Sequence, residues 1–249
     1  MQTLKNRTCI MAGAAGGDGI DSVKALCQGG MNVVMMTHNE EGAKRIAEQI
    51  NACNYTGRCT YKTGRTKPAE EDEEVLQEVI DEFGSIDVVI CNTGGNGNTK
   101  GIDEVSKEEL MSSIEHLTMS SYGMLKANLP YLRVSKAPRV IFMTSIEGIQ
   151  GGCIESFSNA VAKGCVEALT INCASRLAKE GITVNAIAKA GITRVGTLHE
   201  GEADPRDFLP SIPLKRLGTP KDLAEAICFL ASEESSFITG EILHVTGGL

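Results

Sequence analysis

Residues Thr8–Gly19 read TCIMAGAAGGDG, and this stretch decides the fold. Its first five residues form an apolar run of strand length, and a segment of helical period follows its last glycine. Between the two, Gly13, Gly17 and Gly19 are spaced Gly-x-x-x-Gly-x-Gly. Glycines in such a loop let the backbone pass close to a pyrophosphate held at the helix N-terminus. The stretch therefore predicts a strand–loop–helix unit of the nucleotide-binding kind.

Outward from this unit, short apolar runs rich in Val, Ile and Met alternate with longer segments of helical period. The alternation predicts βα units and a parallel sheet whose strands are buried on both faces. We expect a single α/β domain over residues 1–249, built on a Rossmann-type, doubly wound, seven-stranded parallel sheet. The predicted strands are Thr8–Ala12, Asn32–Met36, Arg58–Lys62, Ile86–Cys91, Arg139–Thr144, Thr183–Ile187 and Ile242–Val245.

Capping residues predict where two helices begin. Ser106 followed by Glu109 forms a capping box that opens a helix to about Leu132. Thr219-Pro220 places a capping hydroxyl ahead of a proline at the first helical position. The stretch Ala188–Ile212 has no clear period, and a long loop in a compact domain is usually functional, so we expect a substrate lid there.

Composition narrows the class of partner. The chain has a net charge of −8 and a pI near 5.1. Binding to nucleic acid demands a basic face, so we expect no nucleic-acid partner. No stretch approaches the roughly 18 apolar residues of a membrane span, and Met1–Arg7 carries no signal-peptide pattern, so we expect a cytoplasmic protein. The nine cysteines form no Cys-x-x-Cys pair, which predicts reduced thiols and no metal site.

Five further motifs resemble those of the short-chain dehydrogenase/reductase family, as the glycine loop does. They follow the predicted strands or end the chain: Asn92-Thr93-Gly94, Met143-Thr144-Ser145, Val184–Ile187, Pro213–Gly218 and Thr239–Gly248. The resemblance covers the whole chain. It implies an oxidoreductase fold that uses NAD or NADP on a hydroxyl or carbonyl group.

The same resemblance implies which residues line the site. Ser145 stands where the family carries its active-site serine. Family members that use NAD usually carry an acidic residue at the end of the second strand, where it binds the ribose hydroxyls. This chain has Thr37-His38-Asn39 there. The lack of an acidic residue favours NADP, or no nucleotide, over NAD. The implied nucleotide contacts are Gly13, Gly17, Gly19, Thr37, His38, Asn92, Gly94, Lys163 and Ile192.

The family's proton-transfer motif is broken. Its Tyr-x-x-x-Lys reads Asn159-Ala-Val-Ala-Lys163 here, so the lysine is retained and the tyrosine is not. A carboxamide does not titrate and cannot serve as the acid or base. The asparagine of the family's catalytic tetrad aligns with Leu117, which cannot hold a water molecule. No tyrosine follows Tyr131, which excludes a shift of register.

Two further departures surround the predicted nucleotide site. Asp18 replaces an aliphatic residue of the glycine loop. A carboxylate about 4 Å from a pyrophosphate oxygen costs on the order of 4 kcal/mol at an effective dielectric near 20, so we expect weak nucleotide binding. After the sixth strand, Lys189-Ala190 replaces the family's Pro-Gly, unless that motif is shifted to Ala190-Gly191.

Four residues are weighed as substitutes for the missing acid. His116 adjoins Leu117 but faces about 100° away on a helix. Tyr122 also points off that face, and Glu147 and Glu155 read more simply as solvated loop carboxylates.

The departures favour a non-catalytic subunit that keeps the fold and assembles with a related active subunit. This arrangement resembles that of the dehydrogenase acting on 2-(hydroxybenzyl)succinyl-CoA. The resemblance adds acyl-CoA thioesters to the expected substrates. We expect a heterotetramer, with a homotetramer as the alternative. Residues expected to pack between chains are Ala160, Ala162, Ala168, Ala174 and Leu177 of Phe157–Leu177, with Ile242, Leu243 and Val245 of the last strand.

The alternative function is an active oxidoreductase with altered chemistry. Enoyl- and dienoyl-thioester reductases of this family also lack the usual tyrosine, and Asn92–Asn96 resembles their Asn-Ala-Ala-Gly-Asn.

Overall fold

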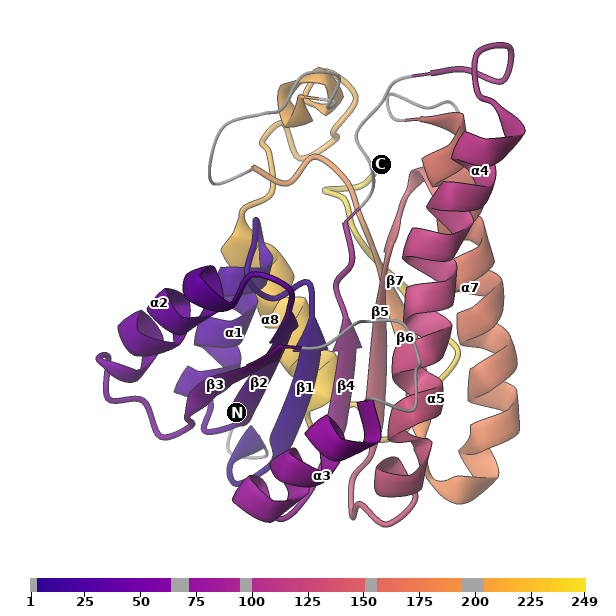
Figure 1. The fold of residues 1–249 in the computed structure, drawn as a ribbon. Helices are drawn as coiled ribbons and strands as arrows, with labels where there is room; N and C mark the ends of the chain where they lie inside the picture. The colour runs from indigo at the N-terminus through magenta and orange to yellow at the C-terminus, as the bar shows by residue number, and fades with distance from the viewer. Residues whose placement is uncertain (1–3, 64–71, 95–99, 151–155, 194–203) are drawn as a thin grey trace.

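A computed structural model describes residues 4–63, 72–94, 100–150, 156–193 and 204–249. Seven parallel strands form one sheet in the order β3-β2-β1-β4-β5-β6-β7 (Figure 1). The seven predicted strands are confirmed, and none of their ends differs from the prediction by more than two residues. Their bounds are β1 Thr8–Ala12, β2 Asn32–Thr37, β3 Cys59–Thr63, β4 Val88–Cys91, β5 Arg139–Ser145, β6 Thr183–Lys189 and β7 Ile242–Val245.

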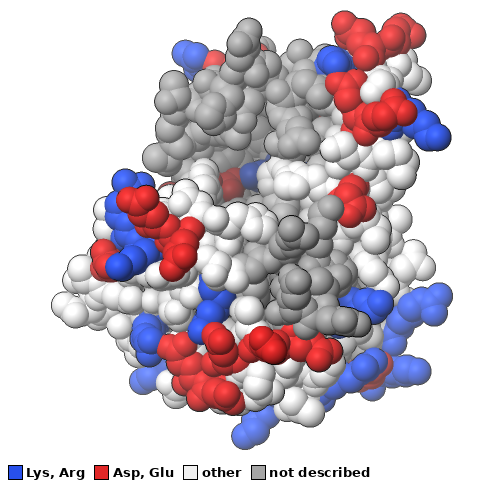
Figure 2. Space-filling view, in the orientation of Figure 1, with Lys and Arg blue, Asp and Glu red and all other residues white. Residues whose placement is uncertain are grey.

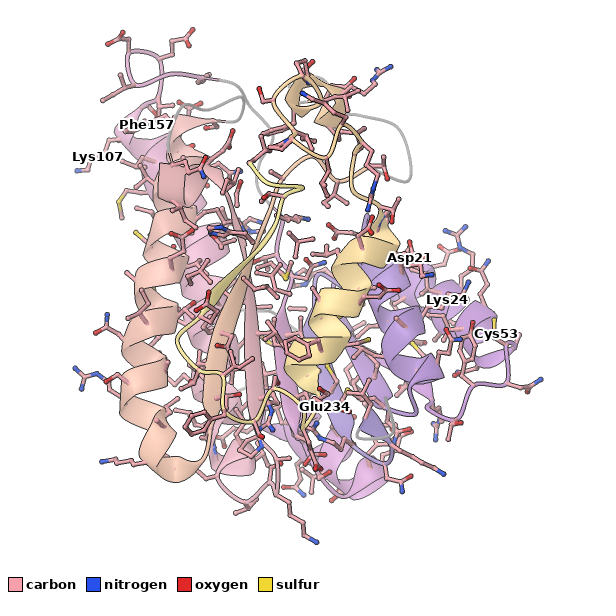
Figure 3. All side chains as sticks on the ribbon, turned by 180° about the vertical axis from the view of Figure 1, so that it is seen from behind. Asp21, Lys24, Cys53, Lys107, Phe157 and Glu234 are labelled. Carbon is pink, nitrogen blue, oxygen red and sulfur yellow. The ribbon has the colours of Figure 1, made fainter. Side chains whose placement is uncertain are left out.

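Helices cover both faces of the sheet, as Figures 1 and 3 show from opposite sides. In the order of the chain they are α1 Gly19–Gln28, α2 Glu40–Asn51, α3 Asp72–Phe83, α4 Lys107–Ser113, α5 Ser120–Leu132, α6 Glu147–Gln150, α7 Phe157–Leu177 and α8 Pro220–Ala231. A π-helical segment, η2 (Ile114–Met119), joins α4 to α5, and two short 3₁₀ segments are η3 (Ala178–Glu180) and η4 (Pro205–Phe208). The fold is therefore the predicted doubly wound Rossmann type, with the sheet between two layers of helices.

Alternate residues of each strand supply two hydrophobic cores. In β1, Cys9 and Met11 pack with α1, α2 and α8, whereas Ile10 and Ala12 pack with α3, α5 and α7. Successive side chains of a strand point to opposite faces, so a strand covered on both sides must be apolar throughout. This is why each strand could be recognised as a continuous apolar run.

The predicted capping box at Ser106 and the predicted capping hydroxyl of Thr219 are both confirmed. The Ser106 hydroxyl accepts from the Glu109 amide at 3.1 Å, and a Glu109 carboxylate oxygen accepts from the Ser106 amide at 2.9 Å. Thr219 and Asp222 make the same exchange at the start of α8. The helix predicted to reach Leu132 does so, but its middle widens into η2.

The long helix α7 lies beside α4 and α5 in both ribbon views, and Phe157 and Lys107 stand at the same end of these helices (Figure 3). The structure corrects part of the predicted contact surface on α7. Ala162, Ala174 and Leu177 are buried within this chain's own fold, because that face of α7 packs on the sheet and on η2. Ala168, by contrast, is exposed.

Among the residues with described positions, no helix is both long and apolar enough to cross a membrane.

Candidate functional site

The sheet reverses its direction of progression between β1 and β4. The chain adds β2 and β3 on one side of β1 and then returns to place β4 on the other. In open parallel sheets of this kind, ligands bind in the crevice outside the carboxyl ends of the strands at this point. Figure 2 shows a hollow on this face, with acidic and basic side-chain atoms visible inside it.

The glycine loop closes tightly against the end of β4. Gly13 has a φ of +68°, and a Cβ there would lie 2.0 Å from the Asn92 carbonyl oxygen. A Cβ on Gly19 would lie 2.5 Å from the Gly13 oxygen. The Asn92 side chain donates to that same oxygen at 3.1 Å, which fixes the loop. Gly17 has a φ of +51° and open space beside it, so it leaves room at the mouth of the crevice.

Asp18 stands immediately before α1, but its carboxylate does not cap the helix. Its backbone oxygen accepts from the Ser22 hydroxyl at 3.0 Å, while the side chain turns away. The amide groups of the first turn of α1 therefore keep the positive end of the helix dipole directed at the crevice, where an anion is favoured.

The structure corrects the prediction that Asp18 presents a bare charge. Its carboxylate forms an ion pair with the Lys189 ammonium and accepts from the Asn92 amide at 3.2 Å. The exposed fractions of the two charged side chains are 12% for Asp18 and 34% for Lys189. Two residues that depart from the family pattern thus neutralise each other, and the expected repulsion of a pyrophosphate loses most of its basis.

Burial raises the pKa of Asp18, but the Lys189 charge and the hydrogen bonds from Lys189 and Asn92 outweigh it. The pKa of the carboxyl group therefore lies below its ordinary value, and Asp18 is ionised at neutral pH.

Lys163 ties the ends of two strands together. Its ammonium is buried and donates to the Thr93 and Met143 carbonyl oxygens at 3.1 and 2.8 Å, beside the ends of β4 and β5. Asn159 lies one turn earlier on the same buried face of α7. The residue that the resemblance aligns with the family's tyrosine therefore shares a face of α7 with Lys163, and its carboxamide does not titrate.

Leu117 is completely buried in η2, where it offers no polar atom to the site. The η2 segment packs against α7, because the Thr118 hydroxyl donates to the Ala162 oxygen at 3.0 Å. His116 is exposed, and the Tyr122 ring lies 5.7 Å from the Lys126 ammonium on the outer surface. Both side chains therefore lie on the exposed surface, away from the buried positions of Asn159 and Lys163.

Ser145 is the last residue of β5 and is buried at the carboxyl edge of the sheet. Its hydroxyl accepts from the Glu147 amide at 3.4 Å. Glu147 corrects a prediction, because it is buried rather than a solvated loop carboxylate. The cause is the short helix α6, which packs so closely on α7 that a Cβ on Gly148 would lie 2.9 Å from the Gly164 nitrogen. Glu155 lies outside the described residues.

The remaining nucleotide contacts implied by the sequence lie along the same edge. Thr37 ends β2 and accepts from the Asn39 amide at 3.0 Å, and His38 beside it is exposed. Gly94 is exposed after β4. Ile192 is buried after β6, where it bridges to Gly218. The sheet thus gathers these residues at one edge, while part of the predicted lid (194–203) lies outside the described residues.

A titratable group of α7 lies behind the site. Glu167 accepts from the Thr144 hydroxyl at 2.8 Å. Burial raises the pKa of Glu167, and the hydrogen bond from Thr144 and the charges of His244 and Lys163 offset only part of this rise. Because the pKa in the folded state lies above that in the unfolded state, this group stabilises the fold below its unfolded pKa, and the contribution is lost as the pH rises through the folded pKa.

Glu167→Gln is therefore expected to raise the melting temperature at pH 7–8. The amide oxygen can still accept from Thr144, while the cost of a partly buried charge disappears. The gain should be about 1–2 °C, since 1 kcal/mol corresponds to about 2–4 °C in a domain of this size and partial exposure screens the charge. Thermal unfolding of both proteins from about pH 4 to pH 8 checks this. An equal gain at both ends of that range contradicts an electrostatic origin.

Comparison with known proteins agrees with the fold and the motifs. The family model described as enoyl-(acyl carrier protein) reductase matches residues 13–249. The 3-oxoacyl-[acyl-carrier-protein] reductase FabG of Vibrio cholerae is 30% identical over 246 residues, which span 99% of this chain and 98% of the relative. The enzyme of the same name from Staphylococcus epidermidis is also 30% identical over 246 residues, covering 98% of this chain and 99% of its own.

Solved structures give the same result. The 3-ketoacyl-(acyl-carrier-protein) reductase from Brucella melitensis complexed with NADH is 25% identical, with a TM-score of 0.86 and 98% of both chains covered. A 3-oxoacyl-[acyl-carrier protein] reductase from the same organism with bound NAD is 24% identical, with a TM-score of 0.86, covering 100% of this chain and 92% of its own. The chain belongs to the short-chain dehydrogenase/reductase family, whose members are NAD(P)-linked oxidoreductases.

Proposed function

We propose that this chain is the non-catalytic subunit of an NAD(P)-linked short-chain dehydrogenase/reductase complex that acts on the hydroxyl or carbonyl group of an acyl thioester. The observation that carries the proposal is Asn159, which is buried one turn from Lys163 at the position of the family's tyrosine. The names of the relatives, 3-oxoacyl-[acyl-carrier-protein] reductases, supply the substrate class.

The chemistry of ketone reduction explains why the residue at position 159 is decisive for activity. Reduction places negative charge on the carbonyl oxygen, and a positioned acid that delivers the proton contributes about 10²–10⁴-fold to the rate. The Asn159 carboxamide can orient an oxygen by hydrogen bonding, but it releases no proton at neutral pH. Leu117 adds no polar group, and the Lys163 ammonium is held by backbone carbonyls.

Assembly with a second subunit is the other half of the proposal. Large apolar side chains are exposed along the outer face of α4, η2, α5 and α7. Met111 and Ile171 have exposed fractions of 52% and 54%, and Met119 and Tyr122 are also exposed. Clustered apolar side chains of this kind mark surfaces that another protein covers. We propose a related, active subunit as the partner, in a heterotetramer.

One observation favours a second candidate, an active reductase with altered chemistry such as an enoyl- or dienoyl-thioester reductase. Glu147 places a buried carboxyl group two residues beyond Ser145 at the carboxyl edge of the sheet. If Glu147 supplies the proton, Glu147→Gln lowers the turnover of the purified chain about 100-fold or more. If the chain is a non-catalytic subunit, there is no turnover to lower.

The purified chain is expected to reduce 3-oxoacyl thioesters with NADH or NADPH at least about 100-fold more slowly than the ordinary range of about 1–10³ s⁻¹. The absorbance of the reduced nucleotide follows the reaction. Asn159→Tyr alone should not restore turnover, since Leu117, Asp18 and Lys189 remain. Co-expression with a related subunit that keeps the tyrosine motif supplies the control, because that complex should be active. Family-level turnover by the unmodified chain alone contradicts the proposal.

A further inference from the structure

The pair formed by Asp18 and Lys189 lies across the crevice. Lys189 ends β6, where its Cα partner on β5 is Ser145, and its backbone oxygen accepts from the Ile146 amide. Asp18 is held from the other side by Asn92, which directly follows β4. Because β5 lies between β4 and β6 in the sheet, the two side chains together cross over the carboxyl end of β5. We call this pair the strap.

The strap stands in the path of half of a dinucleotide. In folds of this class the pyrophosphate sits at the N-terminus of the first helix, and the ribose of the adenosine half lies near the end of the second strand. The other half must then extend toward the ends of β4, β5 and β6, where Ser145, Asn159 and Lys163 lie. Asp18 and Lys189 join across this space.

The two halves of the nucleotide therefore fit the residues differently. The glycine loop fits a pyrophosphate, since Gly13 and Gly19 leave no room for a Cβ and the open side of Gly17 faces no atom within 4 Å. The region beyond it does not fit a nicotinamide ribose while the strap is closed. The Asp18 carboxylate is held by Lys189 and Asn92, and its side chain is only 12% exposed. Opening the strap therefore separates two opposite charges in a place that water reaches poorly.

We propose that the strap is a specificity device that admits the adenosine diphosphate part of a nucleotide and excludes the nicotinamide part. NADH and NADPH can seat their second half only by separating Asp18 from Lys189. The crevice should consequently bind ADP at least as tightly as either dinucleotide. The inference rests on the proposed function only for the class of ligand, and it concerns binding rather than turnover.

The test measures the binding of ADP, NADH and NADPH to the full chain by calorimetry. The double variant Asp18→Ala/Lys189→Ala removes the strap and leaves the net charge of the crevice unchanged. We expect it to bind NADH or NADPH at least about tenfold more tightly than the unmodified chain, with the dissociation constant for ADP unchanged within about twofold. Lys189→Ala alone should weaken ADP binding, because the Asp18 charge is then unbalanced.

Two further variants serve as an independent test and as a control. Asp18→Asn keeps the size of the side chain and removes the attraction to Lys189, so it should produce part of the same gain even if the double variant folds poorly. Glu180→Gln is the matched control, since it removes a carboxylate from the exposed Arg133–Glu180 ion pair and should leave all three affinities unchanged.

The inference is overturned if the unmodified chain binds NADH or NADPH about tenfold more tightly than ADP. It is also overturned if neither Asp18→Asn nor the double variant gains affinity for a dinucleotide, including the case in which no nucleotide binds to any of them. The proposed function is judged separately by turnover: a double variant that gains affinity but remains inactive supports both, whereas one that turns over rapidly contradicts only the non-catalytic assignment.

Discussion

A chain that carries Ala168→Glu will no longer form the proposed heterotetramer, and the partner subunit co-expressed with it will lose most of its activity. Ala168 is exposed on α7, one turn before Ile171, on the apolar surface that we assign to the partner. A carboxylate enclosed in such an interface without a partner costs about 3–5 kcal/mol, which is about a 100- to 5,000-fold loss of affinity. The residue touches neither Ser145 nor Lys163, so the loss of activity would act through assembly.

Native mass spectrometry and the activity of the co-expressed partner measure this effect. Ala52→Glu is the matched control: it makes the same exchange at an exposed position, the C-cap of α2, on the opposite side of the molecule from α7 (Figure 1). Both variants should melt within about 1 °C of the unmodified monomer, because neither position is buried. An intact heterotetramer with full partner activity in Ala168→Glu would place the interface elsewhere.

The strands and helix starts could be predicted because local sequence determines them. Each strand is an apolar run buried on both faces, and each capping box joins residues three positions apart. The end of β6 was harder to predict from the sequence. It continues to Lys189 because that residue pairs with Ser145 of β5 and Val245 of β7, and its charge at the end of an apolar run gives no sign of this pairing.

The strap shows what sequence reasoning missed in the site. Asp18 and Lys189 are 171 residues apart, and each by itself reads as damage to a nucleotide site. Their opposite charges were the available signal, since Asp18 lies in the glycine loop and Lys189 ends β6, both at the carboxyl edge of one sheet. Two substitutions that introduce opposite charges at the same edge of the sheet predict an ion pair rather than two independent losses of nucleotide contacts.

The π-helical turn η2 was not visible in the sequence either. Its extra residue per turn leaves no distinctive period over six residues, and the contact it makes lies on another element, where the Thr118 hydroxyl donates to the Ala162 oxygen of α7. The burial of Glu147 has a similar origin, because the contact between α6 and α7 encloses it.

Gly13→Ala is expected to destabilise the fold by about 3 kcal/mol, which corresponds to roughly 6–12 °C in melting temperature. The left-handed φ of +68° costs an alanine about 1–2 kcal/mol. The new methyl group would also lie 2.0 Å from the Asn92 carbonyl oxygen, so the loop must move away from β4. That movement strains the hydrogen bond from the Asn92 amide to the Gly13 oxygen, worth about 0.5–1.5 kcal/mol.

Gly16→Ala in the same loop is the control, because a Cβ there meets no atom within 4 Å and the φ of Gly16 is not positive. It should unfold within about 0.5 kcal/mol of the unmodified chain. Denaturant unfolding of the three proteins measures the difference directly. If Gly13→Ala matches Gly16→Ala, the contact between the glycine loop and Asn92 does not hold the crevice in shape. Asn92 would then also be a weaker anchor for the strap, since its side-chain amide donates both to the Gly13 oxygen and to the Asp18 carboxylate.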